Sequence, residues 1–312
     1  MRIIILGYQN RAGVAETVQA LRPSIQKHAE IVLEDLTGKA DLSTVSADVA
    51  LVFGGDGSIL RAVQQMGKHQ LPLLAVNLGR LGFLAGLSRD DDLIAVLGKL
   101  EFLERKLGPA WLEELHEASE FETWNQHLTS RETEGFSVSE YRLLNCSVLR
   151  QAGTSRESVI SYLVMNETAI QSADFHMIEV CIWADEECLT TCRCDGMILS
   201  TPIGSTAHNL SVGGPILRPG LDAVVISPIA PHSMTFRPVV DSSLRTYGFQ
   251  LRTEGIETAV VVDGCRIANI SSADRVEVSP SPIQFRMLNV PGFSYYSKLQ
   301  KKLGWGGHLT DI

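Results

Sequence analysis

The stretch Val49-Ala50-Leu51-Val52-Phe53-Gly54-Gly55-Asp56-Gly57-Ser58 is the part of the sequence that decides the fold. Its first five residues are apolar and rich in valine, which predicts a buried strand that stops at two glycines. Apolar residues recur at helical spacing directly after Ser58, so a helix is expected there. A strand, a glycine turn and a helix together aim backbone N–H groups and a helix N-terminus at an anion.

Asp56 leaves two interpretations of this turn open. A carboxylate repels a phosphate, so its presence makes sense where the chemistry needs a base or a metal ligand beside that phosphate. Alternatively, Asp56 or Ser58 caps the helix in an ordinary tight turn. The turn by itself does not decide between a functional and a structural role.

Residues 1 to about 100 alternate between strand and helix patterns. Helices are expected over about 13–28, after Ser58, and from Asp90 to about Leu103; the strands are expected at Ile3–Leu6, Ile31–Leu33, Val49–Phe53 and Leu73–Val76. This alternation predicts a doubly wound α/β domain with a parallel sheet. Ligands of such sheets lie at the carboxyl ends of the strands, where a second glycine-rich loop (77–86) also emerges. Neither a G-x-G-x-x-G fingerprint nor a G-x-x-x-x-G-K-[ST] loop is present.

The second half of the sequence has a different texture. After Gly135, short β-rich runs alternate with turn residues, which is typical of an all-β sandwich. We therefore expect an α/β domain over 1–140, a β-sandwich over 141–291, and a C-terminal helix within 292–312 that returns to the first domain. Residues from about Glu104 to Gly135 are acidic and lack a continuous apolar stripe, so we interpret them as an inserted surface element or partner-facing helix.

Composition narrows the function further. The net charge of −9 argues against a nucleic-acid-binding protein. No apolar run is long enough for a signal peptide or a membrane span, so a cytoplasmic protein without a membrane partner is expected. Four cysteines are close together, at positions 181, 188, 192 and 194, but their spacing lacks the paired C-x2-C of common zinc sites. We favour half-buried free thiols over a metal site.

Two further stretches contain groups that suit a polar ligand. In Asn166-Glu167, a carboxylate and an amide could together bind sugar hydroxyls, although two solvated polar residues would look the same. The segment 193–215 ends a β-run at Thr201-Pro202 and continues into a hydroxyl-rich turn near Ser205. Such a turn suits a phosphate-bearing ligand, while a helix cap followed by a Gly-Gly-Pro turn is the structural alternative.

Taken together, these stretches resemble the NAD kinases, which phosphorylate NAD to NADP. The resemblance runs from about Val49 to Gly304. The matching motifs are Gly54–Ser58, Asn77-Leu78-Gly79 with Leu81-Gly82-Phe83-Leu84, Asn166-Glu167, Asp195-Gly196 through Thr201-Pro202-Ile203-Gly204-Ser205-Thr206-Ala207, Pro231-His232-Ser233 with Arg237-Pro238, and Leu303-Gly304-Trp305. The glycine–aspartate turn is shared with lipid kinases and phosphofructokinases; the combination is specific.

The resemblance implies roles for matching positions. Asp56 would be the general base for the 2′-hydroxyl of the adenosine ribose, with ATP and Mg²⁺ as phosphoryl donor and metal. The turn that approaches the phosphates would comprise Gly54, Gly55, Gly57 and Ser58. Residues implied to bind NAD are Asp56, Gly57, Asn166, Glu167, His176, Arg193, Asp195, Thr206, Ala207, His208, Asn209, Leu210 and Ser211. Asp195 would be reached across a subunit interface, in a homodimer or homotetramer.

Three positions depart from the family pattern. His208 replaces a usual tyrosine, Ile203 a frequent hydroxyl residue, and Cys265 lies near a usual glutamine. Two other functions stay open at this stage: a lipid or sugar kinase that shares the glycine–aspartate turn, and a catalytically weak NAD-binding regulator. The sequence does not distinguish ATP from polyphosphate as donor, or NAD from NADH as acceptor.

Overall fold

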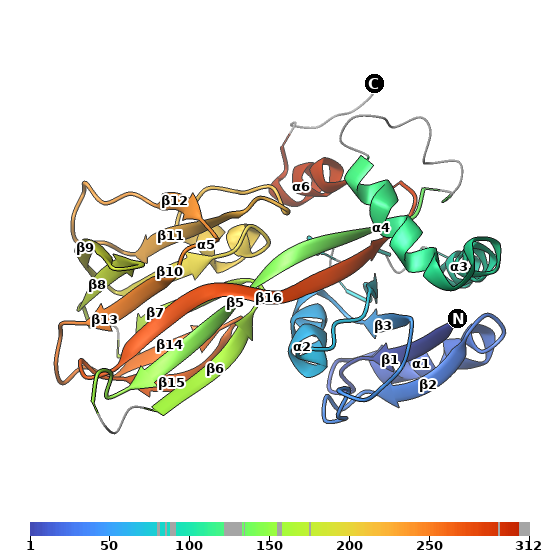
Figure 1. Ribbon diagram of the computed structural model, residues 1–312, viewed down its shortest axis with the longest axis horizontal. Helices are drawn as coiled ribbons and strands as arrows, with labels where there is room; N and C mark the ends of the chain where they lie inside the picture. Colours follow the sequence, from blue (N-terminus) through green and yellow to red (C-terminus); the bar gives the residue numbers. More distant parts are fainter. Residues whose placement is uncertain are drawn as a thin grey trace. The chain divides into compact units, whose positions relative to one another are not determined.

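The computed structural model describes residues 1–79, 82–84, 86–87, 92–121, 133, 135–154, 158–174, 176–292 and 294–305. The chain forms two compact units (Figure 1). The first comprises Met1–Glu140 and Phe285–Ile312, and the second comprises Tyr141–Gln284. The second unit ends at Gln284 rather than at residue 291, because the last strand of the chain runs on into the first unit.

The first unit is built on a parallel sheet whose strands stand in the order β2-β1-β3-β4. These are β1 (Arg2–Leu6), β2 (Glu30–Asp35), β3 (Val49–Phe53) and β4 (Leu73–Val76). Every residue of β3 and β4 is buried, as expected for strands covered on both faces. The strand order reverses between β1 and β3, which is where open α/β sheets bind their ligands.

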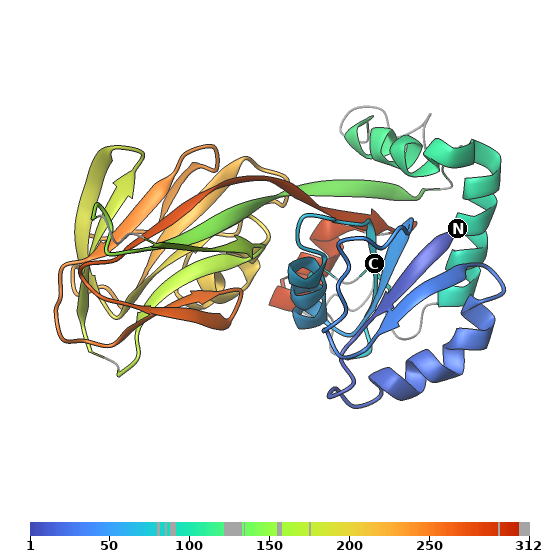
Figure 2. The same cartoon turned by 60° about the horizontal axis from the view of Figure 1, so that its bottom comes forward.

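Helices cover the two faces of this sheet, so the doubly wound α/β prediction is confirmed. Residues of α1 (Val14–Ile25) and α3 (Leu93–Leu107) share a core with alternate residues of β1 and β3, including Ile3, Ile5 and Leu51. In Figure 2, α2 (Asp56–Met66) lies on the face of the sheet opposite to that covered by α1 and α3. The remaining helical elements of this unit are a 3-10 turn (Gly108–Ala110), α4 (Trp111–Phe121) and α6 (Tyr295–Leu303).

The segment expected to be a surface insertion contributes to this core. Trp111 and Leu115 of α4 are 2% and 0% exposed and belong to the core of this unit, where α4 contacts α3. Two buried residues four positions apart lie on the same face of a helix, which is enough for α4 to pack in the core. The acidic residues between them make this apolar face hard to recognise in the sequence. The helix α3 also begins later than expected, at Leu93. Asp92 caps it by accepting from the N–H groups of Ile94 and Ala95.

The second unit is a β-sandwich. One layer contains β5 (Ser137–Arg150), β6 (Ser158–Val164), β8 (Ile178–Ala184), β9 (Glu187–Cys194), β13 (Tyr247–Leu251) and β16 (Arg275–Asn289). The other has the order β12-β11-β10-β7-β14-β15, with β7 (Glu167–Ser172), β10 (Gly196–Ser200), β11 (Ala223–Ile229), β12 (Val239–Ser242), β14 (Thr258–Val262) and β15 (Cys265–Ile270). Apolar residues of both layers form one core.

Sequence patterns missed parts of this sandwich. The β-rich runs at Arg275–Val278 and Gln284–Asn289 are separated in the sequence by two prolines, yet they form the single strand β16. In β16, Arg275–Val278 pair with β13 and Met287 pairs with β4. Pro280 and Pro282 lie between these two paired parts, so their missing N–H groups interrupt neither pairing.

Three of the four clustered cysteines are more deeply buried than expected, while Cys188 is exposed. Cys192 and Cys194 are 2% and 0% exposed, and all six cysteines are free thiols. Cys181 lies 3.6 Å from Cys188, sulfur to sulfur. Among the described residues, no group of three or more His, Cys, Asp and Glu side chains could hold a metal ion. Within the same ranges, every helix is too short or too polar to span a membrane.

Candidate functional site

The glycine turn at the end of β3 depends on residues without side chains. Gly54 adopts φ 139°, and a Cβ added there would lie 2.1 Å from Ser58 Oγ. No side chain caps the N-terminus of α2 within the described residues, and Gly55 occupies the N-cap position. The first N–H groups of a helix have no intrahelical acceptor, so this turn offers backbone donors to an anion.

Asp56 is held at the start of α2 by the second glycine-rich loop. Its carboxylate accepts from the backbone N–H of Phe83 (2.8 Å) and of Leu84 (3.3 Å). Gly82 lies so close that a Cβ there would stand 2.1 Å from Asp56 Oδ1. Lys302 of α6 lies over Phe83, with Nζ 5.3 Å from the ring centre. The loop therefore fixes the carboxylate through two backbone N–H groups; Leu81 of the motif is outside the described residues.

Two further residues line this turn: Asn77, which belongs to a motif matched in the sequence, and Arg11, which the sequence did not single out. The guanidinium of Arg11 lies beside the glycines, because a Cβ added at Gly55 or Gly57 would be 3.5 Å or 3.3 Å from its nitrogens. Asn77, at the end of β4, lies 3.8 Å from the same point on Gly55. Arg11 follows β1, so its loop and the glycine turn flank the point where the strand order reverses. The position of Arg11 directly after β1, next to this reversal, is the signal in the sequence that could have indicated its place at the site.

In the second unit, Asn166 and Glu167 present buried polar atoms. They are 9% and 7% exposed, and Asn166 Oδ1 and Glu167 Oε2 have no hydrogen-bond partner among the described residues. Burial, followed by the nearby charge of Asp263, raises the pKa of Glu167 to about 7, against the opposing effect of a hydrogen bond from the backbone N–H of His208. Buried oxygens without partners are costly, which favours a ligand that satisfies them.

The Thr-Pro-x-Gly-Ser-Thr motif is interlocked with this pair. Thr201 donates its backbone N–H to the Asn166 carbonyl (2.8 Å) and its hydroxyl to the Met165 carbonyl (2.6 Å). A Cβ added at Gly204 would lie 2.0 Å from the Asn166 carbonyl oxygen. Only glycine allows this approach, so much of the motif serves to position Asn166 and Glu167.

The residues that follow differ in their exposure. Thr206, Ala207, His208 and Leu210 are half-buried and Ser211 is exposed. Asn209 is fully buried: its amide donates to the carbonyls of Ser205 and Pro215, and its oxygen accepts from Ser227. These bonds give the Asn209 side chain a structural role in the turn.

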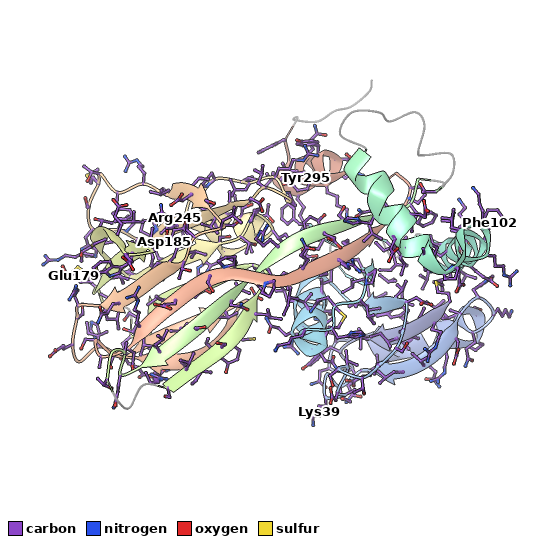
Figure 3. All side chains as sticks on the ribbon, in the orientation of Figure 1. Lys39, Phe102, Glu179, Asp185, Arg245 and Tyr295 are labelled. Carbon is purple, nitrogen blue, oxygen red and sulfur yellow. The ribbon has the colours of Figure 1, made fainter. Side chains whose placement is uncertain are left out.

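His176, Arg193 and Asp195 form a separate group at the other end of β10. The backbone N–H of Ser172 donates to the Asp195 carbonyl, and the N–H of His176 donates to the Ser172 hydroxyl. Arg193 Nε lies 3.9 Å from the carboxylate of Glu179, which Figure 3 labels. Asp195 and Thr201 are six residues apart along an extended strand, roughly 20 Å. In a single copy of the chain, these residues therefore do not lie at the same site as Asn166 and Glu167.

The three departures from the family pattern lie in different environments. Ile203 is 6% exposed and belongs to the protein interior. Cys265 is exposed beside the turn that contains Asp263. His208 is half-buried, and burial lowers its pKa, so its imidazole is held more neutral than a solvated one.

Comparisons with known proteins identify the class. Residues 10–101 match the ATP-NAD kinase N-terminal domain, and residues 165–290 match the ATP-NAD kinase C-terminal domain. These segments contain the glycine turn with Asp56 and the Asn166–Glu167 pair. The protein is therefore a kinase, of the kind that combines an α/β unit with a β-sandwich.

Relatives over the whole chain give the family. The NAD kinase of Rhodopirellula baltica is 39% identical over 99% of this chain and 88% of its own length. The NAD kinase of Azoarcus sp. is 32% identical over 97% and 95%. The chain belongs to the NAD kinase family, as its motifs predicted, which sets aside the lipid or sugar kinase.

Two solved structures share the fold. An Archaeoglobus fulgidus NAD kinase in complex with ATP superposes with a TM-score of 0.64 at 23% identity, covering 97% of this chain and 98% of that one. A yeast NADH kinase complexed with NADH gives 0.73 at 20% identity, covering 100% and 90%.

Proposed function

We propose that this protein transfers the γ-phosphoryl group of ATP to the 2′-hydroxyl of the adenosine ribose of NAD, giving NADP and ADP. The observation that carries the proposal is the carboxylate of Asp56, fixed by the N–H groups of Phe83 and Leu84 in a glycine turn at the sheet's carboxyl edge. Membership of the NAD kinase family supplies the substrates.

The reaction assigns one proton transfer to Asp56. As the ribose oxygen attacks the γ-phosphorus, its proton passes to the Asp56 carboxylate and the bond from phosphorus to the ADP oxygen breaks. The backbone donors of the glycine turn would bind the phosphates. Asn166 and Glu167, whose buried oxygens lack partners, would hold the dinucleotide, together with the exposed parts of Thr206–Ser211.

The residues present suit a magnesium ion that arrives with ATP. Magnesium keeps several waters and is usually held by substrate phosphates and one or two carboxylates, so it needs no cage of protein ligands. Asp56 is the carboxylate available at the turn. The ion would neutralise charge on the phosphates. We further expect a homodimer or homotetramer, in which His176, Arg193 and Asp195 would contact the NAD bound to another subunit.

The test is NADP formation from NAD, ATP and Mg²⁺ by the wild type and by Asp56→Asn. We expect the variant to lose roughly a hundred- to ten-thousand-fold in rate while still binding NAD. Asp92→Asn is the matched control, because asparagine also caps a helix and the residue serves only α3. A folded wild type that binds NAD without making NADP would contradict the reaction. Full activity in Asp56→Asn would remove Asp56 as the base.

A further inference from the structure

Asp263 forms part of a two-residue hairpin turn in the second unit. The strands β14 and β15 pair up to Val262 and Cys265, which leaves Asp263 and Gly264 as the turn. Their φ angles are 48° and 79°, the left-handed pair that a tight hairpin requires and that Asp-Gly favours. This turn fixes the direction in which the Asp263 side chain leaves the sheet.

The Asp263 carboxylate binds three consecutive backbone N–H groups of the chain between β6 and β7. Oδ1 accepts from Asn166 (2.7 Å) and Glu167 (3.1 Å), and Oδ2 accepts from Met165 (3.0 Å). In return, the N–H of Asp263 donates to the Glu167 carbonyl at 3.0 Å. Hydrogen bonds to a charged acceptor are the strong ones, so this carboxylate fixes the backbone from which the side chains of Asn166 and Glu167 extend.

The same carboxylate acts on Glu167 through its charge. Burial of Glu167, then the charge of Asp263, raises the pKa of Glu167 to about 7. Among the described residues, the other titratable groups in this surrounding are His208 on α5, whose pKa burial lowers, and Cys146 on β5, whose thiol pKa burial raises to about 12. The thiol therefore stays neutral near pH 7, and Asp263 is the charge that acts on Glu167.

We propose that Asp263 is a positioning residue for dinucleotide binding: its carboxylate binds the N–H groups of Asn166 and Glu167 and so fixes the backbone from which these two side chains reach the ligand. A protonated Glu167 donates a hydrogen bond as well as accepting one, which matches a sugar hydroxyl and avoids repelling the phosphates of the dinucleotide. The inference rests on the proposed function, in which Asn166 and Glu167 hold NAD.

The experiment measures the Kd for NAD between pH 5 and pH 9 by calorimetry on the full chain. In the wild type, the Kd should rise as pH increases through about 7, where Glu167 loses its proton. Asp263→Asn should weaken binding at pH 7 roughly tenfold, since charge-assisted bonds are lost, and should move the midpoint to lower pH. Glu167→Gln, which cannot ionise, should remove this transition.

Asp185→Asn is the matched control. Asp185 also has a left-handed φ, 53°, in a hairpin turn, between β8 and β9, and it binds Arg245 (2.8 Å) and the N–H of Thr246 (3.0 Å). Figure 3 shows the labelled Asp185 and Arg245 side by side. This substitution removes a comparable set of contacts away from Glu167, so the Kd for NAD and its midpoint should stay as in the wild type.

Three outcomes would overturn the inference. A folded Asp263→Asn variant with the wild-type Kd for NAD and the wild-type pH midpoint would do so. Asp185→Asn changing the Kd and the midpoint as much as Asp263→Asn does would also overturn it. If Asp263→Asn does not fold, Glu167→Gln decides, because a midpoint near pH 7 that survives this substitution cannot belong to Glu167. NADP formation by the wild type separates the two proposals: its absence contradicts the proposed function, whereas its presence with an unaltered Asp263→Asn contradicts only this inference.

Discussion

Arg11 is the residue whose role the structure changes most. Its guanidinium lies against Gly55 and Gly57, and no described carboxylate forms an ion pair with it. A guanidinium matches two phosphate oxygens at once. We therefore predict that Arg11→Ala raises the KM for ATP by roughly ten- to a hundredfold, the loss of one charged hydrogen-bonding contact. The KM for NAD should change little. Steady-state kinetics with each substrate varied in turn would measure both.

The control at this scale is Arg22→Ala. Arg22 lies on α1 of the same unit, where it forms an exposed ion pair with Glu34 at 2.7 Å. Such pairs contribute little to stability, and this one is remote from the turn. Equal effects of the two substitutions on the KM for ATP, or an effect of Arg11→Ala on NAD alone, would show that Arg11 does not bind the donor phosphates.

At the scale of elements, Asp35 ties the end of β2 to α2. Its carboxylate accepts from the backbone of Thr37, Gly38, Lys39 and Ala40, and from the side chains of Thr37 and Gln65 (Figure 3 labels Lys39). Burial alone would raise the pKa of Asp35, but the hydrogen bonds led by that of Thr37 outweigh it and hold the pKa far below the usual 3.8. We predict that Asp35→Asn lowers the unfolding free energy by about 2–4 kcal/mol at pH 7.

The pH dependence of this loss follows from the sign of the shift. Because the folded-state pKa is depressed, the carboxylate stabilises the fold fully above pH 4 and progressively less as pH falls further. The difference between wild type and Asp35→Asn in urea unfolding should therefore narrow from pH 7 to pH 3. Asp41→Asn is the control, since Asp41 is exposed and, in the described part of the chain, accepts only from Ser43. A difference that stays constant with pH would refute this account.

At the scale of the whole molecule, the residues proposed to bind the metal-bearing phosphates and those proposed to hold the dinucleotide lie in different units. The glycine turn with Asp56 lies in the first unit, and Asn166 with Glu167 lies in the second. We predict that EDTA abolishes NADP formation, that added Mg²⁺ restores it, and that the Kd for NAD is unchanged by chelation, because the ion would be bound with ATP. Calorimetry of NAD binding with and without EDTA checks this. Loss of NAD binding in EDTA would contradict it.

Local sequence patterns determined much of this protein. The valine-rich run before two glycines predicted β3 and the start of α2, since burial and turn geometry act within a few residues. The helix expected within 292–312 is α6, with Ser294 at its N-cap and Gly304 at its C-cap. The order of the motifs, ending with Asn166-Glu167 and Thr201–Ala207, indicated the NAD kinase family.

Tertiary structure decided what depends on residues distant in the chain. Trp111 and Leu115 are core residues because α4 packs on α3, which the local sequence does not reveal. Arg11 meets Gly55 because the order of parallel strands brings two loops together. Asp263 reaches the N–H groups of Asn166 and Glu167, about a hundred residues earlier, through strand pairing. A sequence read locally gives propensities and motifs, whereas the partners of a charged side chain are fixed by packing.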